Sequence, residues 1–448
     1  MNNYDVIVIG AGPAGGACAA ECARSGLQVA MVEDYGFGGT CPLRGCNPKK
    51  VLTGAAEIVA LAQGLTGKGL DRASTIIWED LAKFRDEFVK GKKDKIERAY
   101  QDLGIDTYSG RARFVDNYRI RVSSEILQGS YFVLATGIKP ALLSFPGHEL
   151  LSTSDDFLIM NTLPGQICFI GGGFISFELA SVAALAGARV SIVHRGPRVL
   201  KQFDFDLTSG LVKAMEDAGV KIHLNADLES VHRKDGQYAV NFRKNGQQSS
   251  IKADMVVHGA GRTPDVEGLN LELTGVELSS RGITVDRHMQ STSNKRFFAV
   301  GDVADTPYAL TPTGDLEGKV AAANILKSGS TACDYLGVPR VVFTSPPLCA
   351  VGLLEEQALE KKITLEKVHL DMSDWFSWTH LGQRHGACKI LLDKDRKVIV
   401  GAHVLGMGAE ELANMFALAI RLELPVEKIK QVLLAYPTKG YYFKKMLG

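Results

Sequence analysis

The sequence predicts an α/β fold with two Rossmann-like dinucleotide-binding domains, because one strand–turn–helix–strand pattern occurs twice along the chain. The first copy begins near Tyr4 and the second near Gly165, and each has a glycine-rich turn between a strand and a helix of small residues. Two closely spaced cysteines, Cys41 and Cys46, follow the first copy directly. The chain has 448 residues, enough for about three domains, so we expect further structure after the two copies.

The first copy reads YDVIVIGAGPAGGACAAECARSGLQVAMVE and has the G-x-G-x-x-G spacing at Gly10, Gly12 and Gly15. In this motif the first glycine permits a tight turn, the second lets the backbone approach a pyrophosphate, and the third lets the helix pack closely on the strand. The helix N-terminus then offers unpaired N–H groups to the phosphates. Glu33 ends the next strand, where a carboxylate can accept hydrogen bonds from ribose hydroxyls.

The second copy reads GQICFIGGGFISFELASVAALAGARVSIVHR and places Gly171, Gly173 and Ser176 at the three small-residue positions. Its second strand ends in a basic pair that includes Arg195, and Lys201 follows closely. An acid at this point favours NAD, whereas an arginine accommodates the 2′-phosphate of NADP. We therefore expect NADP here. Two dinucleotide sites in one chain imply an internal electron path, from an exchangeable nicotinamide dinucleotide to a tightly held flavin dinucleotide.

Three further segments resemble strands that end in ligand-binding turns. In the stretch NKRFFAVGDVADTPYALTP, Asp302 lies just after a short apolar strand. In YFVLATGIKP and VVHGAGRTPD an apolar strand is likewise followed by a turn. The carboxyl ends of strands are where α/β sheets place the groups that bind ligands. These segments therefore support the prediction of dinucleotide binding.

The stretch GGTCPLRGCNPKK places Cys41 and Cys46 behind a glycine-rich turn, and it is open to a structural, a metal-binding or a redox interpretation. A zinc site needs four ligands at characteristic spacing, and no second close cysteine or histidine pair exists in the sequence. A thiol beside positive charge or at a helix start becomes a reactive thiolate more easily. We therefore favour a redox pair and predict no metal site.

The bulk composition excludes several classes of protein. With 46% hydrophobic residues, 23% charged residues and a net charge of +1, the chain has no global field that would attract nucleic acid or an anionic membrane. The basic run KGKKDKIER is expected to be a solvated helix face. The first residues lack the basic region of a signal peptide, and the eight cysteines do not resemble a secreted disulfide framework. A cytoplasmic protein without nucleic-acid or membrane partners is therefore expected.

In their order and spacing, the two glycine motifs, the CPLRGC pair and the segments ATG, GRTPD and AVGDV resemble the glutathione-reductase type of flavin disulfide reductases. This family includes dihydrolipoamide dehydrogenase and mercuric reductase. The resemblance covers nearly the whole chain and implies a homodimer that shares its active site between subunits, uses FAD and NAD(P), and reduces a small-molecule acceptor. It also implies a C-terminal α+β dimerisation domain. The expected domains are 1–142 (FAD), 143–262 (NAD(P)), 263–334 (central) and 335–448 (interface).

The resemblance carries residue roles onto matching positions. It makes Cys46 the charge-transfer thiolate beside the flavin and Cys41 the outer thiol that attacks the substrate. Glu178 would pair near the flavin with Lys49 or Lys50, and Phe174 would stand where a tyrosine often covers the flavin. The other positions assigned to cofactor binding, besides the glycines, Glu33, Arg195 and Lys201 above, are Pro13, Ala14, Asp34, Gly39, Thr40, Ala112, Ala135, Thr136, Gly137, Ile175, Gly261, Arg262, Asp302, Leu310 and Thr311.

The C-terminal segment AYPTKGYY departs from the family pattern. Most members have a histidine that enters the partner subunit's site and a glutamate five positions later, but here Tyr436 and Tyr441 stand at these positions. Tyrosine titrates near pH 10 and is a poor base at neutral pH. Loss of a positioned acid or base typically costs a factor of ~10² to 10⁴ in rate. Tyr436 is retained as a candidate catalytic residue, but fast reduction of an ordinary disulfide is not expected.

Four interpretations of the altered tail stay open. The preferred one is reduction of a disulfide or polysulfide whose leaving thiol needs no proton. The second is metal-ion reduction, since mercuric reductase also lacks this histidine, although it adds a C-terminal cysteine pair and this sequence has no cysteine after Cys388. The third is carbon–sulfur cleavage, as in a ketopropyl-coenzyme-M-type member with an aromatic at this position. The fourth is a redox-sensing flavoprotein that has lost turnover.

Three smaller features of the sequence also carry expectations. Arg44 lies between the cysteines and would add positive charge to the pair, unless it forms a salt bridge elsewhere. The aromatic cluster DWFSWTHLGQRHG, residues 374–386, is expected to pack an interface or line a substrate cleft. His403 and the six cysteines outside the pair are expected to be buried and structural.

Overall fold

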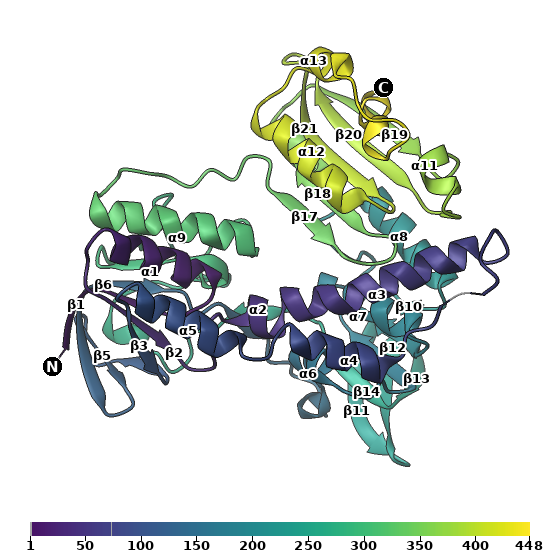
Figure 1. Ribbon diagram of the computed structural model, residues 1–448. Coiled ribbons are helices and arrows are strands. Elements are labelled where there is room, and N and C mark those ends of the chain that lie inside the picture. Colours follow the sequence, from purple (N-terminus) through teal and green to yellow (C-terminus); the bar gives the residue numbers. More distant parts are fainter. Residues whose placement is uncertain (1, 73) are drawn as a thin grey trace. The chain divides into compact units, whose positions relative to one another are not determined.

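The computed structural model describes residues 2–72 and 74–448, and the chain separates into two compact units. Unit 1 consists of residues 1–49, 85–141 and 262–335, and unit 2 of residues 50–84, 142–261 and 336–448. The first nucleotide-binding pattern and the later AVGDV segment fall in unit 1, and the second pattern falls in unit 2. Figure 1 labels many of the elements of both units.

Unit 1 is built on a mostly parallel sheet, seven-stranded within the described residues, whose central strand is buried on both faces. Val6, Ile7 and Val8 are wholly inaccessible to solvent, which explains why the strand is a continuous apolar run and not an alternating pattern. The sheet runs in the order β3 (Asp106–Ser109), β2 (Val29–Glu33), β1 (Asn2–Ile9), β6 (Glu125–Leu134), β5 (Arg119–Val122), β4 (Ala112–Phe114), with β16 (Phe297–Ala299) paired to β6.

Two helices of unit 1 lie side by side although they are far apart in sequence (Figure 1). They are α1 (Pro13–Arg24) and α9 (Thr311–Leu326). Gly318 makes the close approach possible, because a Cβ there would lie 2.2 Å from the Ala14 carbonyl oxygen. The remaining elements of this unit are α2 (Thr40–Arg44), the start of α3 (Cys46–Leu65), the end of α4 (Trp78–Glu87), α5 (Lys92–Asp102), and the β7 (Ile138–Pro140) and β15 (Arg262–Pro264) ribbon.

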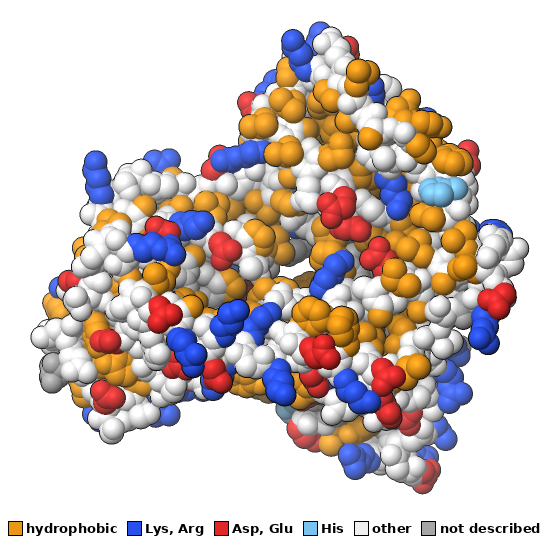
Figure 2. Space-filling model, viewed as in Figure 1, with side chains coloured by type: hydrophobic (Ala, Val, Ile, Leu, Met, Phe, Trp, Pro, Cys, Tyr) orange, Lys and Arg blue, Asp and Glu red, His pale blue; other side chains and the backbone are white. Residues whose placement is uncertain are grey.

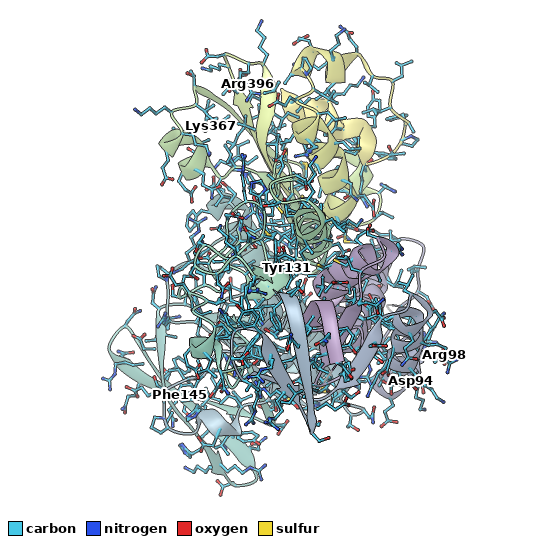
Figure 3. All side chains as sticks on the ribbon, turned by 90° about the vertical axis from the view of Figure 1, so that its left-hand side faces the viewer. Asp94, Arg98, Tyr131, Phe145, Lys367 and Arg396 are labelled. Atoms are coloured by element: carbon cyan, nitrogen blue, oxygen red, sulfur yellow. The ribbon has the colours of Figure 1, made fainter. Side chains whose placement is uncertain are left out.

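The basic run predicted to be solvated forms α5. Asp94 and Arg98 are exposed and point outward in Figure 3. On the face shown in Figure 2, basic side chains lie among acidic ones and form no single continuous patch. The run therefore reads as an ordinary solvated helix face.

The first half of unit 2 has the predicted second Rossmann-like pattern. Its parallel sheet runs in the order β10 (Lys221–His223), β9 (Arg189–Val193), β8 (Gln166–Ile170), β14 (Met255–His258). An antiparallel sheet follows, of β11 (Ala226–Lys234), β12 (Gln237–Lys244) and β13 (Gln247–Ala253). The helices here are α6 (Ser154–Ile159), α7 (Phe174–Leu185) and α8 (Phe205–Asp217).

The C-terminal part of unit 2 is an antiparallel sheet with helices, as expected of an α+β domain. Its strands are ordered β17 (Pro339–Val342), β18 (Leu348–Gly352), β21 (Val398–Leu405), β20 (Ala387–Asp393), β19 (Leu365–Asp371). The helices are α10 (Glu355–Glu360), α11 (Phe376–Thr379), α12 (Ala409–Arg421) and α13 (Val426–Gln431), and two short 3₁₀ turns follow, Gly440–Phe443 and Lys445–Leu447. The fold class is therefore confirmed.

Several smaller predictions can be compared with this part of the fold. Trp375 and Trp378 are buried in the core of the C-terminal domain itself, so they line neither a cleft nor an exposed surface. His403 is fully buried on β21, and its Nε2 lies 3.1 Å from the Leu353 carbonyl oxygen, as expected of a structural residue. Cys333 corrects the prediction that the other cysteines are buried, because it is only half-buried.

The domain boundaries remain a prediction, although residues 50–84 group with unit 2 and not with the expected FAD domain at 1–142. Residues 262–335 group with the first nucleotide-binding pattern, and β16 joins its sheet.

Within the described residues, no helix is both long and apolar enough to cross a bilayer.

Candidate functional site

The first glycine turn has the geometry that its motif requires. Gly10 has a φ of +107°, and a Cβ there would lie 2.2 Å from the Ala135 carbonyl oxygen. At Gly15 a Cβ would lie 2.1 Å from the Gly10 carbonyl oxygen, whereas a Cβ at Gly12 would meet no atom within 4 Å. The first and third glycines therefore close the turn on the ATG segment and on the strand, and the second leaves open space at the start of α1.

The Glu33 carboxylate ties the end of β2 to this turn. Its Oε2 accepts a hydrogen bond from the Ala11 N–H at 2.8 Å, and its Oε1 accepts from the N–H groups of Tyr35 and Gly36. A carboxylate has about four lone-pair sites, so capacity remains for a ribose hydroxyl. The loop that leads to Cys41 closes on the same turn, because a Cβ at Gly39 would lie 2.7 Å from the Gly12 Cα.

Two polar groups near this site fit a hydroxyl-rich ligand. The Thr136 hydroxyl oxygen is buried and makes no hydrogen bond within the part of the chain that the structure describes. The Asp302 carboxyl follows β16, and burial raises its pKa, while the positive charge of Arg262 acts in the opposite direction. Buried polar groups normally have partners, so these two fit a ligand that supplies them.

The two cysteines of the predicted redox pair lie together on consecutive helices. Cys41 lies in α2 and Cys46 is the first residue of α3, and both are free thiols. The Cys41 thiol is hydrogen-bonded to the Cys46 sulfur, and the Thr311 hydroxyl oxygen lies 3.7 Å from the Cys46 sulfur. Thr311 is the first residue of α9, so that helix contributes a hydroxyl to the pair.

These contacts make the two thiols chemically different. The hydrogen bond from Cys41, followed by the Thr311 hydroxyl and the Lys49 charge, lowers the pKa of Cys46 to about 6 against the opposing effect of burial. The same hydrogen bond and burial raise the pKa of Cys41 well above its ordinary value, and the negative charge of Asp315 adds to this. A helix N-terminus also favours a thiolate. These contacts therefore favour the thiolate form at Cys46 and the thiol form at Cys41.

The cation that lowers the pKa of Cys46 is Lys49. The Arg44 guanidinium instead lies 3.6 Å from the centroid of the Tyr35 ring. The predicted positive surroundings of the pair therefore come from the residue three positions after Cys46, and the stacked arginine has a packing contact of its own.

The second glycine turn resembles the first. Gly171 has a φ of +110°, and a Cβ there would lie 2.3 Å from the Gly259 carbonyl oxygen, while Gly173 caps α7. Arg195 and Lys201 follow β9, and both are exposed. Burial lowers the pKa of His194, and the charges of Lys201 and Arg195 lower it further, so the two cations lie near one imidazole.

Phe343 is contacted by two of the residues predicted to act near the flavin. Glu178 is buried and accepts a hydrogen bond from the Phe343 N–H at 2.8 Å. The Lys50 ammonium lies 4.4 Å from the centroid of the Phe343 ring. Phe174, the first residue of α7, is 52% exposed, as a residue that covers a ligand would be. The pairing of Glu178 with a lysine stays a prediction.

The altered C-terminal tail lies on α12. The Tyr436 and Tyr441 rings are in edge-to-face contact with centroids 4.8 Å apart, and Tyr436 is 67% exposed. Lys439 packs on Gly408, where a Cβ would lie 2.5 Å from its Cδ. Burial lowers the pKa of Lys439, whereas the Glu410 and Glu57 carboxylates oppose this. Sequence reasoning missed this charged group, since a lysine in a loop gives no signal by itself.

Comparison with known proteins identifies the family. The model of pyridine nucleotide-disulphide oxidoreductases matches residues 4–321, and the model of their dimerisation domain matches residues 338–447. The chain belongs to this family. A glutathione reductase of Burkholderia cepacia is 30% identical over 443 residues, covering 98% of each chain, and a mercuric reductase of Staphylococcus aureus is 29% identical over 444 residues, covering 97% of this chain and 80% of the relative.

A solved structure and a further sequence relative give the same result. The HOCl-induced flavoprotein disulfide reductase RclA of Escherichia coli, in its Cu(II) complex, has a TM-score of 0.88 and 26% identity, covering 100% of this chain and 99% of that one. Dihydrolipoyl dehydrogenase of Bacillus subtilis is a further relative, 30% identical over 444 residues, covering 97% of this chain and 94% of the relative. The family consists of FAD-binding flavoproteins that act on sulfur groups, and the chain carries its dimerisation domain.

The first nucleotide site fits FAD. The open space at Gly12, the Glu33 carboxylate, the buried Thr136 hydroxyl and the Asp302 carboxyl offer complementary groups to a pyrophosphate and to sugar hydroxyls. The contacts of Cys46 with Cys41 and Thr311 lie in the same unit. Bound FAD would supply a two-electron carrier to this pair.

Proposed function

We propose that the protein is an NADPH-dependent flavin disulfide reductase that uses Cys41 and Cys46 to reduce a small acceptor. The observation that supports this best is the placement of the Cys41 and Cys46 sulfurs together at the start of α3, with the Thr311 hydroxyl 3.7 Å from the Cys46 sulfur. FAD would transfer a pair of electrons from NADPH to the oxidised pair. Asp302, Thr136 and Glu33 would hold the flavin dinucleotide, and Thr311 and Lys49 would stabilise the Cys46 thiolate.

The substrate half of the reaction is ordinary thiol–disulfide exchange. Cys41, once deprotonated, attacks one sulfur of the acceptor disulfide, and the other sulfur leaves as a thiolate that takes up a proton from water. Cys46 then attacks the Cys41 sulfur, releases the second thiolate and restores the Cys41–Cys46 disulfide. Two electrons pass from the pair to the acceptor, and the two product thiols carry two protons.

The tail argues for an acceptor with a good leaving group. The tail has tyrosines where the family has its histidine and glutamate, and tyrosine is in general a weak acid and a poor base at neutral pH. A thiol of low pKa leaves without help, because the rate of exchange rises as the pKa of the leaving thiol falls. We therefore propose a polysulfide or a disulfide of acidic thiols, and a homodimer in which the tail enters the partner's site. We also propose a cytoplasmic location, because eight mostly scattered cysteines do not resemble the disulfide framework of a secreted protein.

An acceptor screen of the purified holoenzyme tests this proposal. Anaerobic addition of NADPH should reduce the bound flavin, and turnover should be faster with polysulfide or an aromatic disulfide of low thiol pKa than with glutathione disulfide. Glutathione disulfide serves as the comparison because its leaving thiol has a much higher pKa than an aromatic thiol. Equal rates with both would contradict the proposed acceptor. Failure with every disulfide, metal ion and quinone would favour a redox sensor.

Reduction of a metal ion is the second candidate. Two relatives favour it, the mercuric reductase of Staphylococcus aureus and the RclA structure in its Cu(II) complex. Against it, the described residues contain no cluster of three or more cysteine, histidine or acidic side chains able to hold a metal. NADPH oxidation that depends on Cu(II) or Hg(II) and needs no disulfide would make this the main activity.

Arg195 and Lys201 are expected to select NADPH over NADH. Both are exposed beside the end of β9, where a 2′-phosphate would lie. A hydrogen bond to a charged group contributes about 1.5–3 kcal/mol, so Arg195→Ala should lower kcat/KM for NADPH by about 10- to 100-fold and leave the value for NADH nearly unchanged. Arg189→Ala is the control, because Arg189 is equally exposed but begins β9. An equal decrease in kcat/KM for NADH would show that Arg195 does not bind the 2′-phosphate.

A further inference from the structure

Glu317 is a completely buried carboxyl in unit 1, outside the contacts of the glycine turn and the cysteine pair. It lies on α9 and has an exposed fraction of 0%. One carboxyl oxygen accepts a hydrogen bond from the Gly301 N–H at 2.7 Å, and the other accepts from the Tyr335 hydroxyl at 2.8 Å. The Thr306 hydroxyl is a further hydrogen-bond partner.

Burying a carboxyl group costs more free energy than burying an apolar side chain of the same size. Moving it out of water is unfavourable unless every oxygen is hydrogen-bonded, and an apolar side chain of similar size often gives equal stability. Burial raises the pKa of Glu317, and the nearby Asp302 charge raises it further. The burial of Glu317 is therefore best explained by the backbone segment that its carboxyl oxygens hydrogen-bond.

What Glu317 holds is the turn that carries Asp302. The turn Gly301–Val303 follows β16, and Gly301 has a φ of +71°, which favours glycine. A Cβ at Gly301 would lie 2.9 Å from the Ala14 Cβ in the first turn of α1. The turn is therefore held between the first glycine motif on one side and the Glu317 carboxyl on the other.

We propose that Glu317 is a positioning residue for the flavin: its bond to the Gly301 N–H fixes the turn so that the Asp302 carboxyl is presented to the sugar-alcohol chain of FAD. Tyr335 completes the arrangement, because its hydroxyl binds the second oxygen of Glu317 and keeps the carboxyl oriented. The inference rests on the proposed role of Asp302 in binding FAD.

The dissociation constant for FAD tests the inference, measured from the recovery of flavin fluorescence when purified holoenzyme is diluted. Glu317→Ala leaves the Gly301 N–H unpaired and should raise this constant by about 10- to 100-fold. Glu317→Gln keeps an amide oxygen for that N–H, so the constant should change by no more than about threefold. Tyr335→Phe removes one bond to Glu317 and should give an intermediate rise.

Asn324→Ala is the matched control. Asn324 lies two turns further along α9, is 5% exposed, and donates hydrogen bonds to the carbonyl oxygens of His288, Val320 and Thr331. Its loss should lower the melting temperature without changing the affinity for FAD. Equal losses of FAD affinity in Glu317→Ala and Asn324→Ala would overturn the inference, since Glu317 would then act only through stability.

Two further results separate the inference from the proposed function. Asp302→Ala should weaken FAD binding at least as much as Glu317→Ala; if it does not, the proposed role of Asp302 is wrong and the inference falls with it. If Asp302→Ala weakens binding but Tyr335→Phe and Glu317→Ala leave it unchanged, only the inference is wrong. Should Glu317→Ala not fold, Tyr335→Phe decides, because an unchanged FAD affinity in that variant contradicts the positioning role.

Discussion

Replacing Cys46 by serine is expected to abolish NADPH-dependent reduction of every acceptor while FAD stays bound. Cys46 begins α3, is hydrogen-bonded to Cys41 and lies 3.7 Å from the Thr311 hydroxyl, and these contacts favour its thiolate form. A serine hydroxyl neither ionises at neutral pH nor forms a disulfide. Loss of such a group costs at least a factor of ~10³ in turnover, which steady-state NADPH oxidation measures.

The same residue predicts a pH dependence. Because the pKa of Cys46 is lowered to about 6, the thiolate is present above that pH and is converted to the thiol as the pH falls through it. The long-wavelength thiolate–flavin absorption band of the reduced enzyme should therefore lose half its intensity near pH 6. In Cys41→Ser the strongest stabilising contact is altered, so the midpoint should move to higher pH. A band that survives in Cys46→Ser would show that the roles of the two cysteines are reversed.

The parts of the site that sequence could predict are those that lie close together along the chain. The turn at Gly10, Gly12 and Gly15 needs its residue types for local backbone reasons, and the structure shows the close approaches that they permit. The same holds for Cys41 and Cys46, five positions apart, because their spacing lets the two sulfurs form a hydrogen bond at the start of α3. In these cases the spacing itself encodes the geometry.

Glu317 could not have been predicted in this way. Its partners, Gly301 and Tyr335, lie 16 and 18 positions away and are brought together only when α9 packs beside the β16 turn. No local sequence pattern indicates that a glutamate side chain accepts a hydrogen bond from a backbone N–H far away in the sequence. For Trp375 and Trp378 the sequence signal was misleading. Their aromatic cluster suggested a cleft or an interface, but both rings are buried in the core of the C-terminal domain, where large aromatic side chains contribute most to stability.

Arg44 and Lys49 show a third limit. Both are cations near the cysteines in sequence, and spacing alone cannot say which one faces Cys46. The helical path of α3 places Lys49 one turn after Cys46, whereas the Arg44 guanidinium stacks on Tyr35. Long flexible side chains are placed by tertiary contacts, so their charge can be assigned to a site only when those contacts are known.

The double variant Tyr436→His, Tyr441→Glu is expected to gain reductase activity toward glutathione disulfide. The two native rings already touch, with centroids 4.8 Å apart, so a histidine and a glutamate there would be placed to form a hydrogen-bonded pair. Histidine titrates near pH 6.5, so its imidazolium donates a proton to a leaving thiolate at neutral pH far more readily than a tyrosine hydroxyl, which titrates near pH 10. A positioned acid or base contributes a factor of ~10² to 10⁴, and kcat/KM for glutathione disulfide measures the gain.

The single variants and the choice of acceptor separate a proton-transfer effect from a change in packing. Tyr436→Phe keeps the ring and removes the hydroxyl, so turnover of an acceptor with an acidic leaving thiol should stay within about threefold of the native rate. In the double variant, that same acceptor should gain far less than glutathione disulfide, because its leaving group needs no proton. If both acceptors gain equally, or neither gains, proton supply at Tyr436 does not limit the native enzyme. Recognition of the acceptor would then set its preference, and the charges of Lys439 and Glu410 beside the tail would be the next residues to exchange.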